Sequence, residues 1–147
     1  MFWKKIGLLL QPNSESAWFK THVGPSFVDV MGVSNLLYVT GRDSANQSHI
    51  GVFQLTASGH HLSVDECSGR HLFSPGDLGA FDESGVSYPW IVHHDGVIFM
   101  YYVGWVAGSR TRFQNYTGLA ISDDGGATFR RARNVPVLDR THEDPYG

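Results

Sequence analysis

Histidine is the side chain most often used to bind metals and to transfer protons near neutral pH, and this 147-residue chain has eight of them. Two adjacent pairs occur, His60-His61 and His93-His94. Neighbouring residues on a strand point to opposite faces, so the members of either pair cannot easily share an ion. The sequence has no cysteine cluster and no His-x-x-x-His spacing. We predict no metal site and no cofactor, because phosphate-binding glycine loops and dinucleotide fingerprints are also absent.

A second set of polar residues has the spacing of a self-capped hairpin. The run from Ser122 to Phe129 fits the pattern S-x-D-x-G-x-T-(W/F). Asp124 can accept hydrogen bonds from turn amides, Gly126 can take a positive φ angle, and Phe129 is expected to pack beneath the turn. The run resembles the Asp-box of sialidases and other carbohydrate-active propellers. We predict a structural role for it, at the hairpin that joins the third and fourth strands of a blade.

These residues belong to a larger pattern, an internal repeat of about 64 residues. The landmarks that recur, at offsets of 64, 63 and 67 residues, are Pro25 and Pro89, Gly41 and Gly104, and Gly51 and Gly118. Three landmarks in one order with nearly one offset are hard to obtain by chance. A longer loop at 110–116 in the second copy accounts for the drift in offset.

Each copy contains four short apolar runs separated by turn residues, which predicts four strands per copy. The expected strands are 25–30, 36–40, 49–55 and 62–65 in the first copy, and 88–93, 97–104, 116–122 and 128–131 in the second. Tandem four-stranded units are typical of β-propeller blades; a β-sandwich built from a duplicated half is the alternative. We predict an all-β, incomplete β-propeller with two four-stranded antiparallel blades and the start of a third.

Residues 1–147 are expected to form a single partial propeller domain. Blade-like repeats span about 21–74 and 84–135, and a third blade begins at about 139–147. Two blades and a fraction cannot close a ring, because known propellers have at least four. Unpaired strand edges and flat apolar faces favour pairing with another chain. We therefore predict a homo-oligomer that completes the propeller.

Composition and charge argue against several kinds of partner. The net charge is −3 without a basic stripe, which disfavours nucleic acid. No stretch approaches the roughly 20 apolar residues of a membrane span, and the apolar run that ends at Leu10 is too short for a signal-peptide core. Cys67 is the single cysteine, so no internal disulfide is possible. We expect a soluble, cytoplasmic protein.

Nearly the whole chain resembles the N-terminal half of a group of uncharacterised proteins similar to five-bladed β-propeller glycoside hydrolases. The stretches that carry this resemblance include Pro75 to Asp82, Gly85 to Val92, Tyr101 to Trp105 and Pro136 to Arg140. Proteins of that group are about twice as long as this chain. The resemblance implies an axial pocket with a carbohydrate as its ligand.

The resemblance also implies where catalytic carboxylates lie. In the better-known five-bladed families they project into the axial pocket from the opening strands of the first blades. Glycoside hydrolysis needs an acid together with a base or nucleophile. The first copy opens with His22 and no carboxylate, which departs from that pattern. Asp82, near the opening of the second copy, and Asp144, at the opening of the third, are therefore the candidate catalytic pair.

Other side chains at blade openings and loop edges are candidates for substrate binding. Arg42 and Asp43 directly follow the second strand, and Trp105 holds the matching place in the second copy. Loop edges concentrate binding residues. Arg42 can hydrogen-bond a sugar hydroxyl or a carboxylate, while an ion pair with Asp43 or Asp82 is the competing interpretation. Trp90 and Trp105 can stack on a sugar ring, and His22 lies where an inner strand begins.

Two functions from different classes follow from these residues. The favoured one is a carbohydrate-active, glycosidase-like protein, an enzyme or former enzyme that acts on or binds a sugar in the axial pocket. The alternative is a non-catalytic carbohydrate-binding or assembly module, or a truncated fragment of a longer glycosidase-like protein. The short chain and the missing carboxylate at the opening of the first copy support the alternative.

Overall fold

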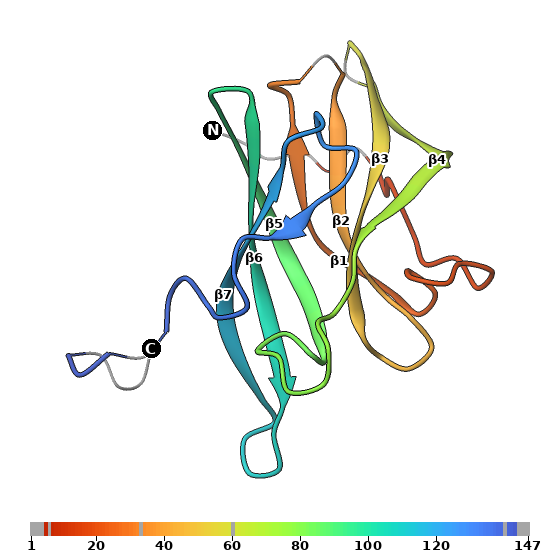
Figure 1. Cartoon of the computed structure of the whole chain (residues 1–147). Helices are drawn as coiled ribbons and strands as arrows, with labels where there is room; N and C mark the ends of the chain where they lie inside the picture. Colours follow the sequence, from red (N-terminus) through yellow and green to blue (C-terminus); the bar gives the residue numbers. More distant parts are fainter. Residues whose placement is uncertain (1–4, 6, 33, 60, 140, 144–147) are drawn as a thin grey trace.

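The computed structural model describes residues 5, 7–32, 34–59, 61–139 and 141–143. Its named elements are eight strands: β1 (His22–Asp29), β2 (Leu36–Arg42), β3 (Ser48–Ser58), β4 (His61–Phe73), β5 (Gly85–His94), β6 (Val97–Ala107), β7 (Phe113–Ser122) and β8 (Arg130–Arg131). They form one mixed, open sheet in the order β1-β2-β3-β5-β6-β7-β8, with β4 paired to β3 (Figure 1). The all-β prediction is confirmed. No helix in the described ranges is long and apolar enough to cross a membrane.

The strands lie where the apolar runs predicted them, with two notable differences in length. β4 was expected over 62–65 and extends over His61–Phe73. Hydrogen bonding to β3 keeps this polar segment extended although its own strand propensity is weak. β8 was expected over 128–131 and has only two residues, because the preceding turn holds Thr128. The predicted start of a third blade falls largely outside the described residues.

The prediction of two separate four-stranded sheets needs a correction. β1 to β4 pair antiparallel with one another, and so do β5 to β8. A parallel pair between Ser48 and Gly85 joins these two sets into one sheet. Gly85 permits the approach because a Cβ at that position would lie 2.2 Å from Ser48 Oγ. We call β1–β4 the first group and β5–β8 the second group.

The two groups share an irregularity at corresponding positions. The β1–β2 pairing shifts register between Val23 and Ser26, and the β5–β6 pairing shifts between Ser87 and Trp90. These positions are 64 residues apart, the offset that the sequence landmarks predicted. Such a shift changes the direction in which the side chains of a strand point. The first strands of both groups, β1 and β5, therefore share the same irregularity near their N-terminal ends.

A hydrophobic core lies between the two groups. Tyr38 and Ile50 of the first group belong to one buried cluster with Met100 and Tyr102 of the second. Phe129 packs against this cluster, and its ring meets Tyr38 edge-on at a centroid distance of 6.3 Å. Side chains from strands far apart in the sequence therefore hold the groups together.

The opposite face of the first group is covered by the N-terminal segment. Leu10, Trp18 and Phe19 join a second buried cluster, in which the Trp18 ring lies 5.7 Å from the ring of Phe53. Gly51 makes room for this contact, because a Cβ there would lie 2.3 Å from the Trp18 ring. The first group is thus covered on both of its faces.

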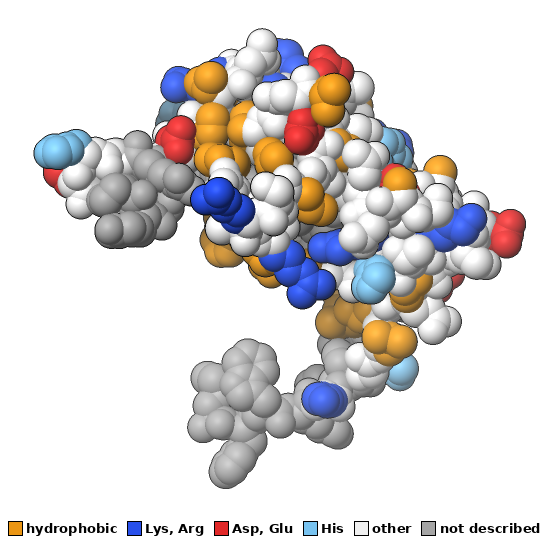
Figure 2. All heavy atoms as spheres, turned by 90° about the horizontal axis from the view of Figure 1, so that it is seen from below, with side chains coloured by type: hydrophobic (Ala, Val, Ile, Leu, Met, Phe, Trp, Pro, Cys, Tyr) orange, Lys and Arg blue, Asp and Glu red, His pale blue; other side chains and the backbone are white. Residues whose placement is uncertain are grey.

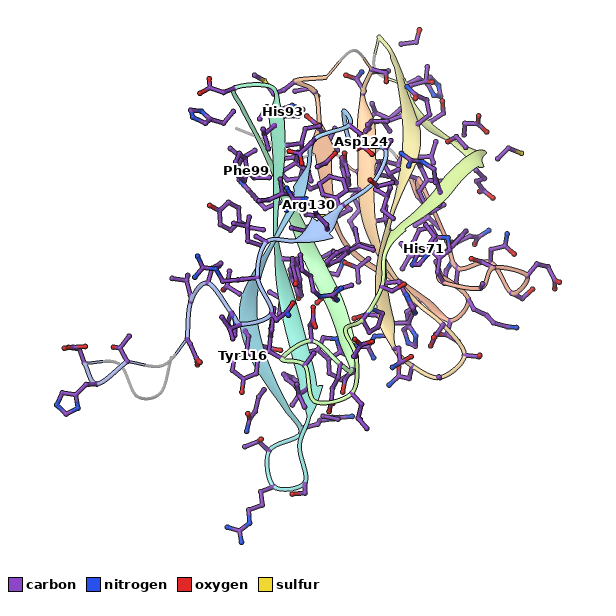
Figure 3. The ribbon with its side chains drawn as sticks, viewed as in Figure 1. His71, His93, Phe99, Tyr116, Asp124 and Arg130 are labelled. Atoms are coloured by element: carbon purple, nitrogen blue, oxygen red, sulfur yellow. The ribbon has the colours of Figure 1, made fainter. Side chains whose placement is uncertain are left out.

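The Ser122–Phe129 run forms the predicted self-capped hairpin. Asp124 Oδ1 accepts hydrogen bonds from Ser122 Oγ at 2.7 Å and from the Thr128 amide at 2.9 Å, and its Oδ2 accepts from Thr128 Oγ1 at 2.6 Å (Figure 3). Gly126 has a φ of +88°. The hydrogen bonds from Thr128 and then Ser122 hold the pKa of Asp124 well below its usual range. The motif stabilises a turn, as its pattern predicted.

Candidate functional site

Two adjoining concavities lie at the end of the sheet where β2 ends and β5 begins. The larger has a volume of about 750 Å³ and the smaller of about 350 Å³, and both are lined by Arg42, Ser87 and Tyr88. The larger one is also lined by polar and aromatic side chains that include Asn46, Gln47, Ser84, Trp105, Arg112 and Asn115. Figure 2 views the molecule from this end and shows Lys and Arg side chains gathered near the middle of the face.

Arg42 and Trp105, which the repeat placed at matching loop edges, lie together in the structure. The guanidinium carbon of Arg42 is 5.6 Å from the centre of the Trp105 ring. Its Nη1 donates to Asn46 Oδ1 at 2.8 Å, while Trp105 Nε1 donates to Ser48 Oγ at 2.7 Å. The ring and the amide therefore orient the guanidinium at the wall of the larger concavity.

Tyr88 is a candidate site residue that the sequence analysis missed. It lies in the register shift of β5 with a φ of +54°, and 61% of its surface is exposed beside both concavities. A left-handed conformation costs a tyrosine about 1–2 kcal/mol, and such strain concentrates at functional sites. Its amide donates to Thr40 Oγ1 at 3.1 Å, which secures this backbone against the first group. Pro89 restricts the residue before it, but this signal does not predict a left-handed tyrosine.

His22 and Asp43 lie near the concavities in different ways. His22 lines the smaller one. Asp43 instead holds the loop after β2, because its Oδ1 accepts a hydrogen bond from the Gln47 amide at 2.9 Å and its Oδ2 is 3.2 Å from His49 Nε2. This loop carries Asn46, the partner of the Arg42 side chain. Asp43 thus acts on the site through the backbone that it positions.

Asp82, a predicted catalytic residue, has no exposed surface. Its Oδ2 accepts hydrogen bonds from the Tyr102 hydroxyl at 2.9 Å and from Arg131 Nε and Nη2 at 2.9 and 2.8 Å. Burial and the neighbouring Asp82 raise the pKa of Tyr102. The structure therefore places this carboxylate in a buried ion pair with Arg131 that lines neither concavity. Asp144, its predicted partner, lies outside the described residues.

Trp90 is separated from Trp105 in the structure. Its ring lies 4.9 Å from the ring of Phe27, and 61% of its surface is exposed. It is not among the described residues that line either concavity. The two tryptophans that the sequence assigned to a sugar therefore do not share one site.

The concavities combine groups that suit a hydroxylated and negatively charged ligand. Tyr88 and Trp105 offer aromatic surface, amides and hydroxyls surround them, and Arg42 and Arg112 bring two positive charges. The described residues that line the concavities include no Asp or Glu. Guanidinium groups bind carboxylates and phosphates through paired hydrogen bonds. The described ranges contain no group of three His, Cys, Asp or Glu residues arranged to hold a metal ion.

The fold is similar to that of a solved protein, a putative glycoside hydrolase from Parabacteroides distasonis ATCC 8503. The TM-score is 0.60, and the match covers 86% of this chain and 36% of that chain. The two sequences are 15% identical, so the likeness concerns the fold alone.

In sequence the chain is similar to two uncharacterized proteins of Mycobacterium tuberculosis, MT1551 of strain CDC 1551 and Rv1502 of strain H37Rv. Each is 32% identical over 151 residues, which covers 99% of this chain and 48% of the relative. The chain spans about half the length of these relatives and matches their N-terminal half, as the resemblance predicted. No family model matches the chain.

Proposed function

We propose that this chain is part of a β-propeller that binds an acidic carbohydrate in the concavities around Arg42. The observation that carries the proposal is the orientation of this guanidinium, 5.6 Å from the Trp105 ring centre and 2.8 Å from Asn46, at the wall of a polar concavity. Tyr88 stands beside it with an exposed ring on a strained backbone. A flat ring suits the apolar face of a sugar, and an oriented guanidinium suits its carboxylate.

The propeller part of this proposal rests on the two groups of strands. Each contains four antiparallel strands with a register shift at corresponding positions, as expected of successive blades. The likeness to the fold of a putative glycoside hydrolase agrees with this interpretation. The concavities of this chain lie where the first strands of the two groups, β1 and β5, begin. In a propeller, the openings of successive blades converge on the axis at this place.

The acidic character of the ligand rests on the balance of charge. Arg42 and Arg112 both line the larger concavity, and no carboxylate does so among the described residues. Two guanidinium groups in one concavity, with no Asp or Glu among its described lining residues, give it a positive charge that attracts an anion. A uronic acid or another sugar with an anionic substituent therefore fits better than an uncharged one.

Calorimetry with matched glycosides tests the proposal. Methyl glycosides of uronic acids should bind at least about tenfold more tightly than the corresponding uncharged hexosides, because a hydrogen bond to a charged group contributes about 1.5–3 kcal/mol. Arg42→Met should abolish this preference. Arg130→Met is the matched control, because that arginine pairs with Asp123 at the surface and neither residue lines the concavities. Equal affinity for both sugar classes, or an unchanged preference in Arg42→Met, contradicts the proposal.

Glycoside hydrolysis is the second candidate function, favoured by the fold of the Parabacteroides distasonis protein. It requires two carboxylates, for which Asp82 and Asp144 stay the predicted pair. Turnover of aryl glycosides should be compared between the native chain, Asp82→Asn and Asp144→Asn. Equal turnover by all three removes these residues from the mechanism, and no turnover by the native chain while a sugar still binds favours pure recognition.

A further inference from the structure

Two sets of side chains with the same chemistry line the larger concavity. We call them the inner set, which is Arg42, Asn46 and Trp105, and the outer set, which is Arg112, Phe113 and Asn115. Each set has a guanidinium group, an aromatic ring and a side-chain amide. In the outer set, 52% of the surface of Phe113 is exposed, so its ring is free to contact a ligand. The groups that suit one acidic sugar residue therefore occur twice in this concavity.

The outer set lies on a part of the second group that has no equivalent in the first group. The β2–β3 pairing ends at Arg42. The equivalent position in the second group is Trp105, and there the β6–β7 pairing continues for two more residue pairs, to Ala107 and Phe113. These pairs lengthen the hairpin by about 7 Å, and Figure 1 shows the β6–β7 hairpin extending past the β2–β3 loop at this end of the sheet. Arg112 directly precedes Phe113, so the outer set lies beyond the inner set along the hairpin.

A single uronic acid does not satisfy both sets. It has one carboxylate, and a guanidinium that binds a carboxylate through paired hydrogen bonds engages both of its oxygens. Arg42 is already oriented by Asn46, 2.8 Å away, and by the Trp105 ring, which favours this carboxylate at the inner set. The positive charge of Arg112 then attracts a second anionic group. The volume of about 750 Å³ lies towards the upper end of the roughly 300–1,000 Å³ of small-molecule sites, so a second sugar ring has room.

We infer that the ligand is an acidic oligosaccharide in which two successive sugar residues each carry an anionic group. The first is bound at the inner set. The second is bound at the outer set, with Phe113 against its apolar face and Arg112 on its anionic group. This inference rests on the proposed function, because it extends the same site by one sugar residue. It makes Arg112 the residue that selects for the length and the charge of the ligand.

Calorimetry with acidic sugars of one and two residues tests the inference. The probes are the methyl glycosides of galacturonic acid and of α-1,4-linked digalacturonic acid, those of mannuronic acid and of β-1,4-linked dimannuronic acid, and the uncharged hexose counterparts of all four. At least one acidic disaccharide should bind about tenfold more tightly than its monosaccharide, because it forms a second charge-assisted contact. The uncharged disaccharides should show a much smaller gain, since they bring no anionic group to Arg112.

Two substitutions on one loop separate the role of Arg112 from that of the loop itself. Arg112→Met should remove the gain of the disaccharide. It should leave unchanged the preference for acidic over uncharged monosaccharides, which Arg42 provides. Arg110→Met is the matched control and should keep the gain, because Arg110 is not among the described residues that line the concavities. Both arginines are exposed, so the melting temperatures of both variants should match that of the parent.

Two results overturn the inference while the proposed function stands. One is equal affinity for the acidic monosaccharides and disaccharides. The other is an equal loss of affinity for both in Arg112→Met, which would assign the two guanidinium groups to one carboxylate. A parent chain that binds acidic and uncharged monosaccharides equally well would instead overturn the proposed function, and this inference with it.

Discussion

Replacing Arg131 with methionine tests whether Asp82 belongs to the framework of the fold. The Asp82 side chain is fully buried, and Arg131, with 24% of its side chain exposed, donates two hydrogen bonds to its Oδ2. Methionine keeps much of the aliphatic volume but removes the charge. The carboxylate would then keep only the hydrogen bond from the Tyr102 hydroxyl. We expect a large loss of stability.

The magnitude follows from the burial of the pair. Removing one member of a buried ion pair costs about 3–5 kcal/mol, because the other charge stays uncompensated. The partial exposure of Arg131 lets water approach, so the lower end, about 3 kcal/mol, applies. The guanidinium also lies 4.5 Å from the centre of the Phe73 ring, a contact that contributes about 0.5–1 kcal/mol. For a chain of this size the total lowers the melting temperature by roughly 10 °C.

Urea unfolding followed by tryptophan fluorescence measures this free energy. Arg130→Met is the matched control, since the adjacent arginine pairs with Asp123 at the surface, with 64% and 58% of the two side chains exposed; such pairs contribute about 0–1 kcal/mol. Adding Asp82→Asn to Arg131→Met should recover most of the loss, because no buried charge remains. A loss below about 1 kcal/mol, or no recovery in the double variant, would refute the framework role.

Three further predictions concern the hairpin, the first group and the core. Asp124→Asn should be less stable than the parent at neutral pH. Because the pKa of Asp124 is lowered in the folded state, this loss of stability should persist above about pH 4 and shrink as the pH falls through the lowered pKa. Urea unfolding across acid pH measures the difference. Gly51→Ala should cost about 1–3 kcal/mol in thermal unfolding, because its Cβ would lie 2.3 Å from the Trp18 ring, whereas Gly24→Ala, 3.8 Å from its nearest neighbour, should cost much less. The Tyr38 hydroxyl is buried without a hydrogen-bond partner in the described residues, and burial raises its pKa to about 12. Tyr38→Phe should therefore be neutral or stabilising by about 1 kcal/mol, and it should retain more stability than the parent in denaturation experiments between about pH 10 and 12.

The strands and the hairpin could be predicted from the sequence because their causes are local. Apolar runs between turn residues marked all eight strands, and the spacing of Ser122, Asp124 and Thr128 specified a turn whose hydrogen bonds span four residues or fewer. The repeat also placed Arg42 and Trp105 at matching loop edges, and the structure brings them within 5.6 Å. A repeated unit puts equivalent residues at equivalent places, so one alignment predicted part of the site.

The other features depend on contacts between distant segments, and local patterns carry little information about them. Asp82 was expected at a pocket and is buried, because Arg131, 49 residues later, reaches it from β8. Tyr88 takes a left-handed φ where β5 shifts register, with its amide bonded to Thr40 of the first group. Trp90 lines neither concavity and packs its ring against Phe27 of β1, because the register shift of β5 decides which side of the sheet this residue occupies. The sequence by itself thus determined the strands, the repeat and the self-capped turn. Only tertiary packing decided which carboxylate is buried, which tyrosine has a strained backbone and which tryptophan reaches the concavities.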